Sequence, residues 1–180
     1  MWAKKEIDEA GYGLTELLVS LPTLIMLLAV TAFLTLWLYQ NYRMQLADLE
    51  LQAEIQLTME RIVEEAHRGS RYVITENGVG SKLTIYRRED SWHGNRVTFA
   101  EETVSFELLA YSGGGHRLVL NQASWPLTGD SDSGLVNISR FYCRSDGAIL
   151  HLELEGRSRF TGHSFALTTD VYFPEMRDEL

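Results

Sequence analysis

Cysteine is almost absent from this sequence of 180 residues, and its one copy, Cys143, rules out a disulfide within the chain. Exported domains can use disulfides for stability, so any folded domain here has to be held together by packing alone. Cys143 ends the strand-like segment Ile138–Cys143. We expect it to be a small buried core residue, with a reactive thiol as the alternative.

Basic residues are also scarce. The chain has 16 Lys and Arg against 25 Asp and Glu, which gives a formal net charge of −9 at pH 7. An acidic chain is a poor electrostatic match for nucleic acid or for an anionic lipid surface. Direct binding of nucleic acid is therefore not expected.

The residue patterns of metal and nucleophilic enzymes are missing as well. No two of the five histidines have helical i, i+4 spacing, and the sequence has no H-E-x-x-H or C-x-x-C motif. No G-x-S-x-G motif follows a strand-like segment, and no Ser/His/Asp set can be assigned. We expect no enzymatic activity and no cofactor.

One polar loop could bind a metal ion. Asp130 and Asp132 stand two residues apart in Gly129–Gly134, and alternating oxygen ligands suit Ca²⁺. A calcium loop of the EF-hand type also needs a late bidentate Glu, and Leu135 to Asn137 supply none. An ordinary solvated loop is favoured over a weak Ca²⁺ site.

Charge is absent from one long apolar stretch near the N-terminus. The run Leu17–Tyr39 carries no charged residue, and as a helix it would be about 35 Å long, which is enough to cross a bilayer core. It is longer than the apolar part of a secretory signal. Pro22 lies inside the run and is expected to kink or loosen the helix.

A single carboxylate stands at the entrance to this run, in the sequence Gly-Tyr-Gly-Leu-Thr-Glu from Gly11 to Glu16. An acidic residue in lipid costs roughly 2.5–3.5 kcal/mol at mid-span, so Glu16 requires a nearby cation. Cleavage after Gly11 would create one, because the new α-amine of Tyr12 would be positive near neutral pH.

This arrangement resembles the N-terminus of the type IV pilin and pseudopilin family. The matching positions are Gly11 before the cleavage site, Tyr12 as the first mature residue and Glu16 as its fifth, followed directly by the apolar run. Gly13 and Thr15 depart from the usual residues, and Ala10 stands where a basic residue is common. The resemblance implies cleavage and N-methylation at Tyr12 by a prepilin peptidase. It also implies that Glu16 meets the α-amine of a neighbouring subunit during assembly.

The rest of the sequence predicts a continued helix and then strands. Between Tyr42 and His67, apolar residues recur at three- and four-residue spacings, which indicates an amphipathic helix with one buried stripe. The stripe consists of Leu46, Leu49, Ala53, Ile55, Met59, Ile62, Val63 and Ala66. Strand-like segments follow at Lys82–Arg87, Arg96–Phe99, Thr103–Tyr111, His116–Gln122, Leu135–Cys143, Ala148–Glu155 and Ser164–Phe173.

Together these patterns predict an α+β fold of pilin-like architecture, with one long N-terminal helix packed on an antiparallel β-sheet domain. Residues 1–11 would be the leader and residues 12–39 the transmembrane or filament-core helix. Residues 40–180 would form the extracytoplasmic domain, with a helix over 40–67 and a β-rich region over 70–174. Among family members, the many strands are most similar to the larger minor pseudopilins, of the J type or PilW-like.

The resemblance implies a structural subunit of a secretion, pilus or competence filament, placed either at its tip or along its shaft. Its partners would be the prepilin peptidase, other pilin or pseudopilin subunits and an inner-membrane assembly platform. The chain would cross the inner membrane once, with its N-terminus in the cytoplasm. The alternative is a signal-anchored, monomeric binding or sensory domain, which predicts no cleavage after Gly11.

Overall fold

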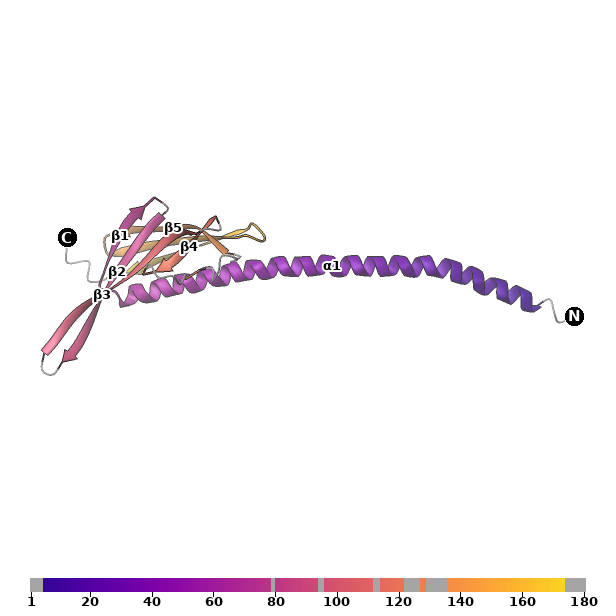
Figure 1. Cartoon of the computed structure of the whole chain (residues 1–180), viewed down its shortest axis with the longest axis horizontal. Coiled ribbons are helices and arrows are strands. Elements are labelled where there is room, and N and C mark those ends of the chain that lie inside the picture. The colour runs from indigo at the N-terminus through magenta and orange to yellow at the C-terminus, as the bar shows by residue number, and fades with distance from the viewer. Residues whose placement is uncertain are drawn as a thin grey trace. The chain divides into compact units, whose positions relative to one another are not determined.

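The computed structural model describes residues 5–78, 80–93, 96–111, 114–121, 127–128 and 136–173. In these residues one helix, α1, is followed only by strands (Figure 1). The elements are α1 (Lys5–Arg68), β1 (Arg71–Asn77), β2 (Gly80–His93), β3 (Arg96–Tyr111), β4 (Gly115–Leu120), β5 (Val136–Asp146), β6 (Ile149–Ser158) and β7 (Ser164–Tyr172). The fold is α+β, as predicted.

The chain divides into two compact units, Met1–Gln45 and Leu46–Leu180, and α1 contributes to both. The first unit contains the predicted apolar run, through which the helix continues past Pro22. The second unit contains the last part of α1 and all the strands. It combines an apolar helix face with antiparallel sheets, an arrangement that is pilin-like.

The strands form two antiparallel sheets, one in the order β1-β2-β3-β4 and the other in the order β5-β6-β7. Each sheet follows chain order, so neighbouring strands are joined by simple hairpins. The turn between β5 and β6 contains Gly147 with φ of +59°, a backbone conformation that glycine adopts without strain. In the same sheet, the pairing of β5 with β6 shifts register between Ile138 and Arg140.

The core of the second unit lies between α1 and the two sheets. Leu51, Ile55, Met59, Ile62 and Ala66 supply the helical part of this core, and all of them are buried. Their spacing of three or four residues places them on one side of the helix. The sheets contribute residues that include Leu83, Phe106, Leu118, Phe141, Leu152, Leu154 and Phe173.

The predicted helix stripe was only half right. Ile55, Met59, Ile62 and Ala66 are buried and Val63 packs against the core, as expected. Leu46, Leu49 and Ala53, however, are exposed, whereas Ala47 and Leu51 are buried in their place. The sequence has apolar residues on two sides of this helix segment, and spacing alone did not show which side faces the sheets.

Each predicted strand segment overlaps a strand of the structure, but several bounds differ. Strand β2 runs from Gly80 to His93 where Lys82–Arg87 was predicted, and β4 ends at Leu120 rather than Gln122. The segments Arg96–Phe99 and Thr103–Tyr111 belong to one continuous strand, β3. Strand β1 was not predicted, because only one of its side chains, Tyr72, is fully buried and the others give no regular apolar alternation. Tyr72 nevertheless ties β1 to the other sheet, since its hydroxyl lies 2.8 Å from Ser145 Oγ and donates to the carbonyl of Gly147 at 3.2 Å.

A buried carboxylate links α1 to the first sheet. The side chain of Glu65 is 5% exposed and pairs with Arg61 at 2.8 Å and with Arg87 of β2 at 3.6 Å. Arg87 also pairs with Glu102 of β3. The sequence showed Glu65 as one of many helix glutamates, so its burial was not foreseen.

Candidate functional site

The predicted processing and assembly residues all fall within α1. Gly11 and Tyr12 lie in the helix, which begins at Lys5, and Glu16 lies one turn further on. Glu16 is exposed and makes no ion pair or hydrogen bond with any described residue.

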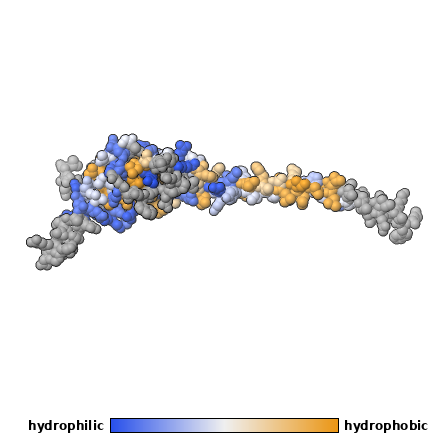
Figure 2. Space-filling view, in the orientation of Figure 1, coloured by the Kyte–Doolittle hydropathy of each residue, from blue (hydrophilic) through white to orange (hydrophobic). Residues whose placement is uncertain are grey.

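The apolar run after Glu16 is exposed along its whole length. Every side chain from Leu17 to Tyr39 is solvent-accessible in the isolated chain. The helix is long and apolar enough to cross a membrane once, which makes it a candidate membrane anchor. Figure 2 shows the apolar residues of this helix gathered into a continuous stretch.

The few polar side chains in this run are satisfied by their own helix. Ser20 donates to the carbonyl of Leu17 at 3.2 Å, and Thr23 donates to the carbonyl of Ser20 at 2.7 Å. Thr31 and Thr35 likewise donate to carbonyls three and four residues earlier, at 2.9 and 2.8 Å. An unpaired hydroxyl would be costly in hydrocarbon, so these bonds suit the segment to lipid or to an apolar helix interface.

A second apolar stripe runs along the exposed side of α1 in the β-rich unit. It consists of Leu46, Leu49, Ala53 and Leu57, all of which are exposed. At 3.6 residues per turn these positions lie opposite the buried side chains of α1. We call them the outer stripe. Its spacing is that of a helix face which packs against another helix.

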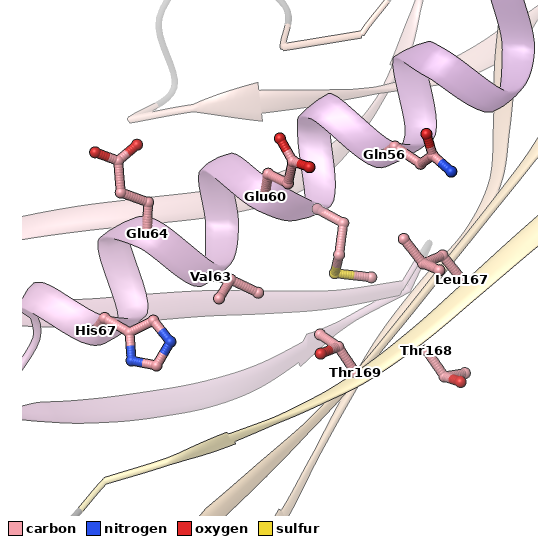
Figure 3. A pocket seen from close by; sticks show the side chains of 9 residues that line it. Gln56, Glu60, Val63, Glu64, His67, Leu167, Thr168 and Thr169 are labelled. Atoms are coloured by element: carbon pink, nitrogen blue, oxygen red, sulfur yellow. The ribbon is translucent and has the colours of Figure 1, made fainter.

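A groove of about 720 Å³ lies between α1 and β7. Met59, Val63 and Leu167 give it an apolar surface, and Glu60, Glu64 and His67 stand along the helix. Figure 3 shows Leu167 and Thr169 directed from β7 toward the helix across this space. The sequence did not predict this groove, because its two walls are about a hundred residues apart in the chain.

The turn between β6 and β7 is bonded to α1 through Asp48. Thr161 donates to one carboxylate oxygen of Asp48 at 2.6 Å, and His163 Nδ1 lies 2.9 Å from the other. These hydrogen bonds, Thr161 first and then His163, lower the pKa of Asp48 from its usual 3.8. These bonds hold the turn against the helix.

Cys143 is a core residue, as expected. Its side chain is 5% exposed, and burial raises the pKa of the thiol to about 12. Its backbone N–H donates to Ser81 Oγ at 3.2 Å, which joins β5 to β2. A thiol with so high a pKa is almost entirely protonated near neutral pH and is a poor nucleophile.

The proposed calcium ligands Asp130 and Asp132 lie outside the described residues. Within the described residues no group of three or more His, Cys, Asp or Glu side chains could hold a metal ion. Comparisons of the chain with protein-family models, with curated proteins and with solved structures found no match.

Proposed function

We propose that this chain is a minor pilin or pseudopilin, a structural subunit of an extracytoplasmic filament. One observation carries the proposal: Gly11, Tyr12 and Glu16 stand in register with an uncharged apolar run, at the start of a helix that leads into antiparallel sheets. Taken alone, each of these features also occurs in proteins of unrelated classes. Their combination in this order is typical of the pilin family.

In this proposal the helix has two tasks. The exposed run Leu17–Tyr39 first anchors the subunit in the inner membrane and then packs among the helices of neighbouring subunits. Glu16 sets the register of that packing by pairing with the methylated α-amine of Tyr12 in a neighbour. A pair of opposite charges buried together costs less than either charge buried alone. Entry into the filament therefore stabilises the carboxylate.

The outer stripe supports the same proposal from the β-rich unit. Leu46, Leu49 and Leu57 leave an apolar helix face uncovered in the isolated chain. Apolar area removed from water contributes about 25 cal/mol per Å², so a helix from a neighbouring subunit would gain stability by packing there.

The deciding measurement is the intact mass of the protein isolated from membranes of cells that contain a prepilin peptidase. We expect the loss of Met1–Gly11 together with the gain of one methyl group. A matched culture without the peptidase serves as the control and should give the full-length mass. Retention of Met1–Gly11 in both cultures would contradict the proposal and favour a signal-anchored monomer.

A further inference from the structure

Strand β7 is the edge of its sheet, and it is regular along its nine residues. It pairs with β6 from Ser164 to Tyr172 without a register shift. Its sequence, Ser-Phe-Ala-Leu-Thr-Thr-Asp-Val-Tyr, has no proline, glycine or lysine, the residues that often prevent an edge strand from pairing further. Its one charged residue, Asp170, is already bonded to His151.

The hydrogen bonds at the two ends of β7 show which backbone groups face outward. The N–H of Ser158 donates to the carbonyl of His163, and the N–H of Phe173 donates to the carbonyl of Ala148. In an antiparallel pair the bonded positions alternate, so the odd-numbered residues of β7 face β6. The even-numbered residues direct their N–H and C=O groups away from it, and no described residue bonds to them. These residues are Ser164, Ala166, Thr168, Asp170 and Tyr172.

The groove beside this edge would hold the side chains of an added strand. Its lining includes the apolar side chains of Met59, Val63 and Leu167, and Figure 3 shows Leu167 of β7 on the side of Val63 of α1. A strand paired with β7 would direct every second side chain toward α1, because side chains alternate between the two faces of a sheet. Such a strand gains backbone hydrogen bonds from the edge and apolar contacts from the groove.

The negative charge of the groove wall favours a basic partner segment over a second copy of this chain. Glu60 is exposed at its helix wall and forms no ion pair within the described residues, whereas Glu64 is paired with Arg61 and Arg68. A second copy of this chain would bring an identical acidic wall against the first, and like charges placed opposite each other are destabilising. A segment that carries basic side chains would complement Glu60 instead.

We propose that the edge of β7 and the adjoining face of α1 bind an extended segment of a partner protein, which adds a strand to the sheet and whose helix-facing side chains, at every second residue, include both apolar and basic ones. The proposal stands apart from the processing of Gly11. It rests on the backbone of β7, the groove and Glu60, and it would hold for an anchored monomer as well as for a filament subunit.

The test uses the full chain in a non-ionic detergent and a capped peptide of nine residues. Every second residue of the peptide, on the face directed at α1, is valine or lysine in turn, and threonine fills the positions between them. Amide hydrogen exchange is measured by nuclear magnetic resonance with and without the peptide. We expect the amides of Ala166, Thr168 and Asp170 to exchange about tenfold more slowly with the peptide bound, as for one added backbone hydrogen bond. The amide of Thr169, which already faces β6, should change little.

Two pairs of variants test separately the backbone hydrogen bonds of the β7 edge and the charge of the groove. Thr168→Pro removes the outward N–H at a position where an edge strand tolerates proline, and we expect it to weaken peptide binding about tenfold. Thr168→Ala keeps that N–H and should bind as the parent does. Glu60→Gln should weaken binding of the lysine peptide, whereas Glu50→Gln, on the same helix but outside the groove, should not.

The proposal is overturned if the peptide gives no alternating protection of β7, or if Thr168→Pro, shown to be folded by its thermal unfolding, binds as well as Thr168→Ala. Equal binding of a peptide in which glutamate replaces each lysine would overturn the requirement for basic side chains. Analytical ultracentrifugation of the chain without peptide tests whether a second copy occupies the edge. A dimer that Thr168→Pro abolishes would assign the edge of β7 to a second copy and overturn the proposal.

Discussion

Ile55 of α1 lies so close to Gly156 of β6 that a Cβ atom on the glycine would stand 2.6 Å from Ile55 Cδ1. The helix and the second sheet therefore approach each other at a point where a side chain on the strand has no room. Leu51 Cδ1, at 3.2 Å from the same position, closes the space from the preceding turn of the helix. This contact sets how closely α1 can pack on β6.

Gly156→Ala should therefore destabilise the β-rich unit by about 1–3 kcal/mol, the usual cost of overpacking a core. Urea unfolding followed by the near-ultraviolet circular dichroism of the full chain in detergent measures this change. Gly78→Ala is the matched control, because a Cβ there meets nothing within 4 Å. Equal stability of the two variants would show that α1 shifts without cost.

Removal of the buried carboxylate at Glu65 should also be costly. Glu65→Ala leaves Arg61 with Glu64 and Arg87 with Glu102, but it removes the buried carboxylate that the two arginines share. We expect a loss of about 1.5–3 kcal/mol, as for a hydrogen bond to a charged group. Glu64→Ala is the control. Its ion pairs are exposed, so its effect should stay within about 1 kcal/mol. The same unfolding measurement compares the two, and a larger effect at Glu64 would contradict the assignment.

The bond between Asp48 and the β6–β7 turn should make stability depend on pH in the acid range. The pKa of Asp48 is lower in the folded chain than its usual 3.8, so its contribution is fully present above that value. It is lost as the pH falls through the folded-state pKa. The difference in unfolding midpoint between the parent and Asp48→Asn should shrink as the pH falls below 3.8. A difference independent of pH would exclude an ionised Asp48 as its cause.

The single thiol should be unreactive in the folded chain. Because burial raises the pKa of Cys143 to about 12, a maleimide or disulfide reagent at pH 7 should modify it only on unfolding. Counting modified thiols by mass spectrometry, with and without urea, tests this. Rapid labelling of the native protein would contradict this prediction and favour a reactive thiol at Cys143.

Glu16→Ala tests the proposed assembly step. We expect the variant to insert into the membrane as the parent does, because its apolar run is unchanged, but to enter filaments much less, because the α-amine of its neighbour loses its counter-ion. Fractionation of cells into membrane and sheared filament measures both quantities. Glu50→Ala, exposed on the same helix, serves as the control. Normal assembly of Glu16→Ala would rule out this charge pair.

The elements of this fold could largely be predicted, because their signals are local. The uncharged run and the alternation of Leu150, Leu152 and Leu154 each reflect a single periodicity. The orientation of α1 was harder, since Leu49 and Leu51 are equally apolar and only contact with β6 decides which is buried. The groove and the edge of β7 could not be predicted, because they depend on strand order and on pairing between distant segments.

The internal hydrogen bonds of Ser20, Thr31 and Thr35 affect how the helix can move. A hydroxyl that bonded to a neighbouring helix would have to break that bond whenever the neighbour changed. Here the acceptor of each hydroxyl is a carbonyl of the same helix, so the hydrogen bond is kept when the helix moves. If this segment is a membrane anchor, these hydroxyls would have no bond to a neighbouring helix to break when the segment rotates or leaves the lipid, so the transfer of the part from Ser20 to Thr35 would be governed by its apolar surface.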